Sequence, residues 1–370
     1  MIKVVDIVYH CHTEYTAPDE LLKKHGPTLG FVPFLKDQVE YSIVRHLAYE
    51  GFQSADNIRY AFFTRPNKPW QIPLKTHRFI KSIQPDIVLV HGFVFPLQVI
   101  ALKMILGKKC ALVLQHHAER PLRSVRKFFQ TMADRCISAY LFTAAEIAQP
   151  WLAAKVIKHA GKVKIMTAAS VAAINHDRSC CKERLGISNG PTFLWVGRLN
   201  QNKDPLTVLK AFAQKVRQYP FAKLYMIYQT AELLPQVETR MEDLQLGGQG
   251  VLVGKLPNEE VSIWMHAADY FISASHAEAA GYALLEAMSA GCIPIVSRIP
   301  SYTTMLQNTP AYLFQPGSVA QLTDILINLD NKNINKESAA IKKYFQDHLS
   351  FQQVADSMLH MFNELYSVKR

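Results

Sequence analysis

The fold is indicated most clearly by Thr192-Phe193-Leu194-Trp195-Val196-Gly197-Arg198, an apolar run that ends in a glycine and is followed at once by an arginine. A short apolar run that ends in a glycine turn is typical of a parallel strand buried on both faces. A helical pattern follows over Pro205–Gln218, and a second apolar run covers Lys223–Tyr228. This alternation of strand, helix and strand predicts an α/β fold with a parallel sheet.

The same alternation extends through both halves of the chain. In the second half, further strands are expected at Val251–Val253, Tyr270–Ala274 and Ile293–Val296. In the first half, strands are expected at Val4–Tyr9, Pro85–Gly92, Cys110–Leu114, Arg135–Phe142 and Val163–Met166. Helices are expected there at Phe34–Gly51, Leu97–Leu106 and Leu122–Ala133. Two consecutive patterns of this kind predict two Rossmann-like doubly wound domains that face a cleft.

The boundary between the two predicted domains falls in the polar, weakly patterned segment 170–189. A length of 370 residues suits two domains. We therefore expect an N-terminal domain at residues 1–172 and a C-terminal domain at residues 173–349. Residues 350–370 have the pattern of an amphipathic helix, which we expect to join the N-terminal domain.

The composition is that of a globular protein with an asymmetric charge. Hydrophobic residues make up 49 % of the chain and charged residues 19 %, which provides enough apolar material for two cores. The net charge of +11 arises entirely in residues 1–175, which hold 23 Lys and Arg against 12 Asp and Glu. A basic half attracts phosphates, anionic lipids or nucleic acid, and a solvated basic face without a specific partner is an equally favoured interpretation. No nucleic-acid partner is expected, because no nucleic-acid motif with interleaved aromatic residues is present.

Targeting and redox signals favour a cytoplasmic protein. The first nine residues form a short strand pattern that contains an acid, unlike a signal peptide. The longest apolar segment, Phe93–Leu106, is interrupted by polar residues and falls short of the ~20 residues that span a bilayer. The six cysteines show neither a C-x-x-C pair nor metal-finger spacing, which favours reduced thiols. A peripheral position at the inner membrane face is a second expectation.

The first chemical feature is the loop after the strand at 192–197. Gly197 allows the backbone to turn at the carboxyl end of the strand, where α/β folds bind ligands. Arg198 offers a planar fork for phosphate oxygens, and Lys203 adds a point charge for the same anion. Taken alone, basic residues after a strand are more often simply solvated.

The second feature lies between the strand expected near residue 270 and the helix that follows it. The free backbone N–H groups of Gly281, Tyr282 and Ala283 at that helix start form an anion site, which suits a diphosphate. Glu278, in the loop, can accept hydrogen bonds from sugar hydroxyls, and Glu286, in the helix, can hold a ribose diol. The simpler interpretation is that Glu278 complements the helix dipole and that Glu286 lies on the solvent-exposed face of its helix or is buried with a partner.

Several motifs occur in a fixed order over most of residues 190–330. They are Val196-Gly197-Arg198-Leu199 with Lys203, Val253-Gly254-Lys255-Leu256-Pro257, Glu278 and Glu286 eight residues apart, Glu286-Ala287-Met288 followed by Ala290-Gly291-Cys292-Ile293-Pro294-Ile295-Val296, and Phe314-Gln315-Pro316-Gly317. Together they resemble the retaining GT-B glycosyltransferases of family four, also called the glycosyltransferase group 1 family. The resemblance implies an enzyme that transfers a sugar from a nucleotide-diphosphate-sugar donor to a sugar or lipid-linked acceptor. Cell-surface polysaccharide or glycolipid synthesis is the implied setting.

The resemblance also assigns roles to residues and domains. The implied donor-binding residues are Gly197, Arg198, Lys203, Lys255, Leu256, Gly281, Tyr282, Ala283 and Glu286. Among them, Arg198 and Lys203 would bind the diphosphate. Glu278 would contact the transferred sugar and Glu286 the ribose, while backbone groups around Lys255 would meet the base. The C-terminal domain would hold the donor, and the N-terminal domain would be the acceptor side.

Two histidines, His116 and His117, end the strand expected at Cys110–Leu114. The family that the chain resembles has a histidine at this point near the reacting sugar, which makes His117 the first catalytic candidate, with His116 second and Glu278 beside them. A neutral imidazole or its backbone can hydrogen-bond a donor sugar and orient it. A strand-end histidine that caps nearby backbone is an equally favoured interpretation for either residue taken singly.

Further histidines end other strands of the first half. They are His10, His12 and His91. A histidine cluster suggests a metal site, but no carboxylate joins these residues at ligand spacing. The family that the chain resembles works without a metal, so neither a metal nor another cofactor is expected.

The first half departs from the family pattern, which leaves alternatives open. His10-Cys11-His12-Thr13-Glu14 stands where the family often has a Gly-Gly loop, and Ala279-Ala280-Gly281 where it has Gly-Phe-Gly. One alternative is a basic binding protein with a degenerate donor site. Another is a different GT-B enzyme, such as a sugar-nucleotide epimerase or a phosphorylase. The basic and apolar segment Arg120–Phe129 suits a lipid-phosphate acceptor or an anionic membrane surface, although a surface helix with an apolar inner side is slightly favoured.

Overall fold

The structure is a computed structural model of the 370-residue chain. It describes residues 1–11, 17–25, 29–35, 38–55, 58–64, 70–117, 119–166, 176–187, 190–307, 309–329 and 333–367. The chain divides into two compact units, one made of residues 1–167 and 351–370 and the other of residues 168–350. The two are called unit 1 and unit 2 below, and each is described by itself.

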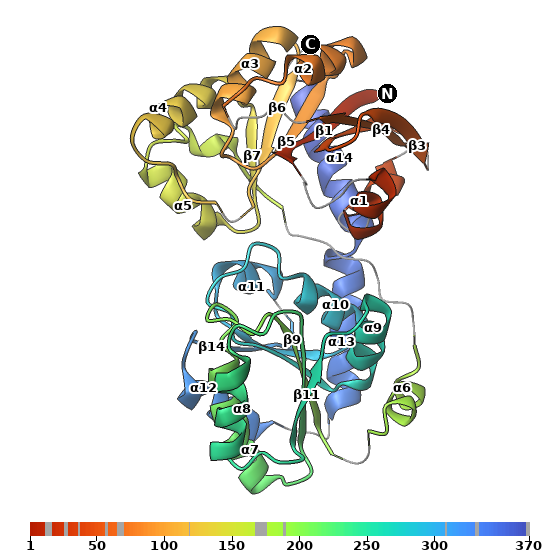
Figure 1. The fold of residues 1–370 in the computed structure, drawn as a ribbon, viewed down its shortest axis with the longest axis vertical. Coiled ribbons are helices and arrows are strands. Elements are labelled where there is room, and N and C mark those ends of the chain that lie inside the picture. The colour runs from red at the N-terminus through yellow and green to blue at the C-terminus, as the bar shows by residue number, and fades with distance from the viewer. Residues whose placement is uncertain are drawn as a thin grey trace. The chain divides into compact units, whose positions relative to one another are not determined.

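Unit 1 is built on a mainly parallel sheet (Figure 1). Its strands are β1 (Ile2–Cys11), β2 (Val39–Leu47), β3 (Gly51–Ala55), β4 (Ile58–Thr64), β5 (Ile87–His91), β6 (Ala111–Gln115), β7 (Ala139–Phe142) and β8 (Val163–Ile165). The strand order is β3-β4-β2-β1-β5-β6-β7-β8, and β3 pairs antiparallel with β4. The chain extends the sheet from β1 through β2 to one edge and then returns to place β5 on the other side of β1. The topological switch point of unit 1 therefore lies between β1 and β5.

The helices of unit 1 come from both ends of the chain. They are α1 (Pro18–His25), the 3₁₀ turn η2 (Val32–Leu35), α2 (Leu74–Ile83), α3 (Pro96–Leu106), α4 (Ser124–Ala133), η3 (Asp134–Cys136), α5 (Ala145–Ala153), η4 (Ala160–Lys162) and α14 (Phe351–Ser367). The blue helix α14 in Figure 1 lies beside the strands of unit 1, where it contacts η2 and β5. Its buried side chains include Phe351, Met358 and Phe362.

The helix predicted at Phe34–Gly51 is wrong, because β2 occupies most of this segment. The β-branched side chains of Val39, Ile43 and Val44 favour an extended backbone. Strands β1 and β4 flank β2 and bury every residue of it except Glu40. The strand predicted at Arg135–Phe142 also begins later than expected, since residues 134–136 form the turn η3.

Unit 2 contains a six-stranded parallel sheet. Its strands are β9 (Thr192–Gly197), β10 (Lys223–Tyr228), β11 (Gly250–Gly254), β12 (Tyr270–Ser273), β13 (Ile293–Ser297) and β14 (Tyr312–Phe314). The order β11-β10-β9-β12-β13-β14 is that of a Rossmann-type doubly wound sheet. The chain reverses direction across the sheet after β11, so the switch point of unit 2 lies between β9 and β12.

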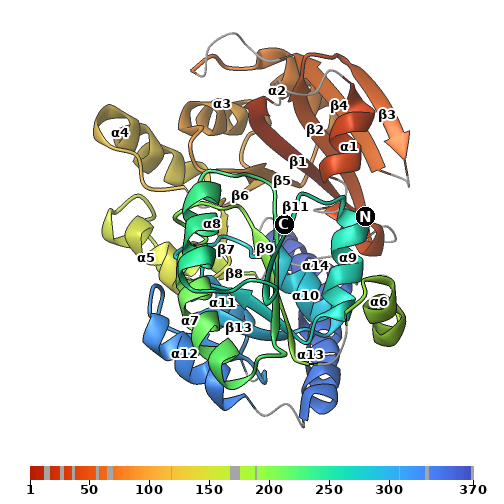
Figure 2. The same ribbon diagram turned by 60° about the horizontal axis from the view of Figure 1, so that its bottom comes forward.

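The helices of unit 2 cover both faces of this sheet. They are α6 (Arg178–Arg184), α7 (Pro205–Gln218), α8 (Leu234–Asp243), α9 (Asn258–Ala267), α10 (Tyr282–Ala290), α11 (Pro300–Met305), α12 (Val319–Asn328) and α13 (Ile334–His348). Figure 1 and Figure 2 show α7, α8 and α12 on one face and α9, α10 and α13 on the other. Successive residues of β9 point to opposite faces of the sheet. Phe193 therefore packs in the core on the side of α7 and α12, and Leu194 in the core on the side of α10 and α13.

Candidate functional site

Two loops meet at the carboxyl edge of the unit 2 sheet, one after β9 and one after β12. Asn202, in the first loop, donates from Nδ2 to the carbonyl oxygen of Ala277 at 3.0 Å and accepts from the Ala277 backbone N–H at 3.1 Å. The N–H of His276 donates to the carbonyl oxygen of Asn202 at 2.8 Å. These bonds fix the two loops against each other at the switch point, where doubly wound folds bind ligands.

An ion pair joins the same two loops through their charged side chains. Lys203 Nζ contacts Glu278 Oε1, and the two side chains keep 22 % and 15 % of their surface exposed. Both groups are therefore shielded but still open to a small ligand. Arg198 is exposed beside Gly197. The structure thus brings Gly197, Lys203 and Glu278 together, and it adds the free charge of Arg198 to the same loop.

Gly281 is the N-cap residue directly before helix α10, and its position requires glycine for two reasons. Its φ of +64° lies in the left-handed region, and a Cβ there would lie 2.6 Å from Cε1 of Tyr302. Tyr302 is fixed in the core, where its hydroxyl lies 3.1 Å from Oγ of Ser273. No side chain caps the helix start, so the N–H groups at Tyr282 and Ala283 point out of the first turn without a cap. Free N–H groups at a helix start favour a negatively charged group.

Glu286 lies one turn further along α10, and its side chain is exposed to solvent. Protein atoms around it nevertheless raise the pKa of its carboxyl by desolvation. The exposed Tyr282, one turn earlier, has its phenol pKa raised by the same cause. A carboxylate that is accessible yet poorly hydrated gains from hydrogen-bond donors on a ligand.

Lys255 and Leu256 follow β11 at the carboxyl edge of the same sheet. Gly254, with a φ of +87°, turns the chain after the strand. Lys255 is exposed, whereas Leu256 packs against the core on the α10 face. The described contacts do not join Lys255 and Leu256 to Glu278 or Lys203. Lys255 and Leu256 therefore lie at a separate position on the same edge of the sheet.

In unit 1, the two strand-end histidines after β6 have different surroundings. His116 is buried, and its ring stacks on Phe142 with 4.9 Å between centroids. Its Nε2 lies 2.9 Å from the carbonyl oxygen of Glu119. His117 is exposed, with its backbone N–H donating to Oε2 of Glu119 at 2.7 Å. His116 thus belongs to the core, and His117 is the one of the two that a substrate can reach.

His117 is also the outer member of a hydrogen-bonded chain that sequence reasoning missed. Its Nε2 lies 2.8 Å from Nδ1 of His91, and Nε2 of His91 lies 2.9 Å from Oδ2 of the fully buried Asp6. Arg45 contacts the other carboxylate oxygen of Asp6 at 2.7 Å. An acid inside the apolar strand pattern of residues 1–9 was the available signal, since such a group needs a partner when buried.

Other groupings in the described residues are limited. Across the described ranges, no three or more His, Cys, Asp or Glu side chains are placed to hold a metal ion. His12, one of the predicted strand-end histidines, lies outside those ranges. None of the helices in the described parts of the chain has both the length and the apolar content needed to cross a membrane.

Two doubly wound α/β units in one chain are the architecture of GT-B-type proteins. Residues 181–347 match the family model of Glycosyl transferases group 1. Unit 2 thus contains a glycosyltransferase group 1 domain, and the enzyme class and the domain family expected from the sequence are confirmed.

A segment of 126 residues, 34 % of the chain, is 28 % identical to an alpha-monoglucosyldiacylglycerol synthase of Streptococcus pneumoniae. The matched segment spans 28 % of the length of that relative.

Solved structures match the fold over nearly the whole chain. A glycosyltransferase from Rickettsia africae superposes with a TM-score of 0.75 and 15 % identity, covering 98 % of each chain. Anabaena Alr3699/HepE, in a complex with UDP and glucose, superposes with a TM-score of 0.72 and 13 % identity, covering 98 % of this chain and 100 % of its own. The predicted fold class is therefore confirmed.

Proposed function

We propose that the chain is a retaining glycosyltransferase that moves a hexose from a nucleotide-diphosphate-sugar to a sugar or lipid-linked acceptor, in cell-surface polysaccharide or glycolipid synthesis. One observation carries the proposal. At the switch point of unit 2, the loop with Lys203 is bonded to the loop with Glu278, directly before the uncapped start of α10. Cations, a helix N-terminus and a carboxylate at one place suit the diphosphate and the sugar of such a donor.

In the proposed reaction, the bond between the anomeric carbon and the diphosphate breaks while a bond to the acceptor oxygen forms on the same face of the sugar. Arg198, Lys203 and the N-terminus of α10 neutralise the charge that grows on the leaving diphosphate. The departing phosphate oxygen takes the proton of the acceptor hydroxyl. Glu278 accepts hydrogen bonds from hydroxyls of the transferred sugar.

The remaining donor residues act on the nucleoside. Glu286 accepts hydrogen bonds from the ribose diol, which replaces the poor hydration of its carboxylate. Backbone groups at Lys255 and Leu256 meet the base. Because protein cations neutralise the diphosphate, no metal or other cofactor takes part in the proposed reaction. Full activity in the presence of excess EDTA is the expected result, and loss of activity that Mg²⁺ or Mn²⁺ restores would contradict it.

A thermal-shift screen against UDP-, GDP-, ADP- and CDP-sugars tests the donor site. One nucleotide class should raise Tm in the wild type, because a ligand that binds only the folded state stabilises it. Arg198→Ala should abolish that rise, whereas Arg217→Ala, which removes an exposed arginine of α7, should retain it. No shift with any nucleotide would favour the basic binding protein with a degenerate donor site. With a donor in hand, NMR of the product distinguishes retention from inversion at the anomeric carbon.

The surface of α4 supports a membrane-bound setting for the acceptor. Val125, Phe128 and Met132 recur along one side of this helix with 68 %, 61 % and 40 % of their surface exposed. The inner side holds Gln130, whose Nε2 donates to the carbonyl oxygen of Phe93 at 2.9 Å. Ala133 is buried and Phe129 half-buried on α4, so this helix has an apolar inner side and also exposes large apolar side chains to solvent.

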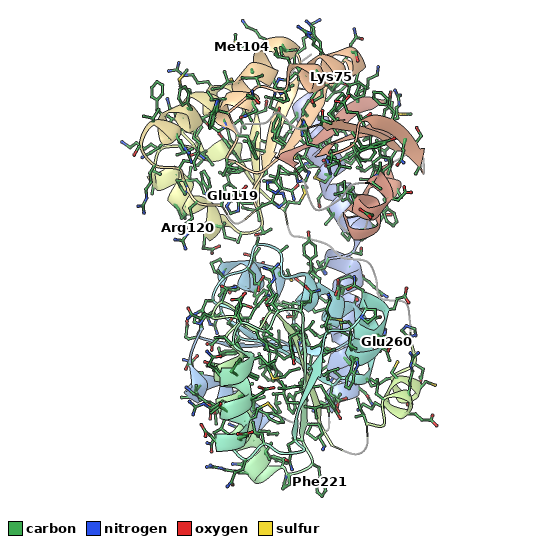
Figure 3. All side chains as sticks on the ribbon, viewed as in Figure 1. Lys75, Met104, Glu119, Arg120, Phe221 and Glu260 are labelled. Atoms are coloured by element: carbon green, nitrogen blue, oxygen red, sulfur yellow. The ribbon has the colours of Figure 1, made fainter. Side chains whose placement is uncertain are left out.

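Basic side chains accompany this apolar face. Arg120 and Arg123 precede α4 and Arg126 lies on it, all three exposed, and Figure 3 shows Arg120 at the surface of unit 1. Apolar side chains flanked by cations suit an anionic lipid surface. The Streptococcus pneumoniae relative, a synthase of a glucosylated diacylglycerol by its name, is consistent with a lipid-linked acceptor.

Vesicle flotation tests the membrane proposal. The chain should float with vesicles that contain phosphatidylglycerol at low salt, and Phe128→Ser should reduce the bound fraction several-fold. Phe221→Ser is the matched control, because Phe221 is an even more exposed aromatic residue, on unit 2 (Figure 3). Absence of wild-type binding, or equal loss in both variants, would contradict the proposal.

A further inference from the structure

The switch point of unit 1 holds a buried carboxylate with three donors. Oδ2 of Asp6 accepts from the Tyr41 hydroxyl at 3.0 Å and lies 2.9 Å from Nε2 of His91, while Oδ1 accepts from Nη1 of Arg45 at 2.7 Å. Burial alone would raise the pKa of Asp6, but the charges of Arg45 and His91 and the hydrogen bonds of both residues hold it well below its usual range. Asp6 is therefore an ionised acceptor.

This acceptor determines which nitrogen of His91 carries a proton. A carboxylate only accepts hydrogen bonds, so Nε2 of His91 must donate to Asp6. When the His91 ring carries one proton, held at Nε2 by this bond to Asp6, its Nδ1 is the acceptor.

The tautomer of His91 determines the tautomer of His117. Nδ1 of His91 accepts from Nε2 of His117 across 2.8 Å, which leaves Nδ1 of His117 as the nitrogen with the free lone pair. Desolvation, together with the neighbours His91, His116 and Arg45, lowers the pKa of His117 to about 3 against the opposing effect of Asp6, so the ring stays neutral. The stacked rings, with centroids 5.1 Å apart, keep the exposed imidazole in place.

We propose that Asp6 and His91 are positioning residues that hold His117 as the neutral Nε2–H tautomer, so that its Nδ1 accepts a hydrogen bond from a sugar hydroxyl. The inference rests on the proposed function for the identity of the hydroxyl. It goes beyond that function because it fixes the direction of the hydrogen bond. A hydroxyl can donate to this nitrogen, whereas a group that only accepts, such as a carbonyl or a phosphate oxygen, cannot.

The tautomer is measured by nitrogen NMR on the ligand-free full chain with ¹⁵N-labelled histidine. The His117 signals are identified by their absence in His117→Gln. In the wild type, Nε2 should show a protonated shift and Nδ1 an unprotonated one. His91→Leu removes the acceptor and should give a mixture of tautomers. His91→Gln offers an amide N–H to Asp6 and an amide oxygen to His117, and it should restore the wild-type signals.

Kinetics supply the second readout. His91→Leu should lower kcat by about 10-fold, the effect of one lost hydrogen bond, with KM for the donor nearly unchanged. His91→Gln should recover most of this loss. An unchanged His117 tautomer in His91→Leu, or equal kinetic loss in both variants, would overturn the inference. The nitrogen shifts are read without substrate, so a failure of the proposed transferase activity leaves the test of the tautomer intact.

Discussion

The two units place different chemistry at equivalent positions, the switch points of their sheets. In unit 2, the charged groups of Arg198, Lys203 and Glu278 remain at least partly exposed and lie beside a helix start without a side-chain cap. In unit 1, Asp6 is fully buried and already has all its partners. The first arrangement suits an incoming anion, and the second holds one imidazole in a fixed proton state. A doubly wound fold thus provides the switch point, and the burial of a charged group there determines whether it can bind a ligand or is paired with neighbouring residues.

The largest expected effect tests the buried arrangement of unit 1. Asp6→Asn leaves the Arg45 charge unpaired in the core and should lower the free energy of unfolding by about 3–5 kcal/mol. Asp86→Asn, which changes a half-buried aspartate that accepts a backbone N–H, should cost much less. Urea unfolding measures both, and equal losses would contradict the distinction.

Acid unfolding sharpens the same point. The folded pKa of Asp6 lies below its ordinary value, so its stabilising contribution is complete above the unfolded value of about 4 and is lost as the pH falls through lower values. The stability of the wild type should therefore decline steeply below about pH 4. Asp6→Asn should show a flatter decline in that range, and parallel curves would contradict the assignment.

The next effect concerns the open arrangement of unit 2. Lys203→Ala should lower kcat by about 100-fold or more, because the cation acts on charge that develops in the transition state. Stability should change little, since the ion pair with Glu278 is partly exposed. Lys210→Ala, which removes an exposed lysine of α7, is the control and should leave kcat unchanged. A raised KM with normal kcat would instead indicate a role in ground-state binding alone.

A smaller effect separates backbone strain from close packing at the helix start. Gly281→Ala combines a positive φ with a Cβ that would lie 2.6 Å from Tyr302, and it should weaken donor binding while destabilising unit 2 by about 2 kcal/mol. Gly186→Ala has a similar φ of +62° but meets no atom within 4 Å, so about 1 kcal/mol is expected there. Calorimetry with and without nucleotide distinguishes the two, and equal losses would exclude the steric contribution.

The smallest effect concerns Glu286. Its pKa is raised by desolvation, so the ionised form costs stability as the pH rises through and above its ordinary value. Glu286→Gln should therefore raise the free energy of unfolding at neutral pH, by no more than about 0.5 kcal/mol for such an accessible group. It should also weaken nucleotide binding. A loss of stability together with unchanged binding would contradict the proposed ribose contact.

Local pattern predicted the elements of unit 2 closely because strand and helix signals alternate there with clear glycine and proline boundaries. Pro205 and Gly291, for example, mark a helix start and a helix end that the structure reproduces. In unit 1, β2 was mistaken for a helix because Arg45 and His46 interrupt its apolar run. Their partners, Asp6 and the carbonyl oxygen of Val8, lie on β1 and far away in the sequence.

The same limit applies to the candidate sites. The motifs after β9 and β12 lie in short segments whose spacing is visible in the sequence, so Lys203 and Glu278 were predicted individually. Their mutual contact, and the hydrogen bonds of Asn202 that join the two loops, depend on the pairing of β9 with β12. The chain from Asp6 through His91 to His117 joins β1, β5 and the loop after β6, so it leaves no local spacing to detect.

The position of α14 has a consequence for biosynthesis. Unit 2 is one continuous segment, whereas the core of unit 1 needs Phe351, Met358 and Phe362 from a helix made after all of unit 2. During vectorial synthesis, unit 2 can therefore fold as a self-contained insert while unit 1 waits for its last helix. A chain that ends before residue 351 would contain the whole of unit 2 but would lack the last helix of unit 1.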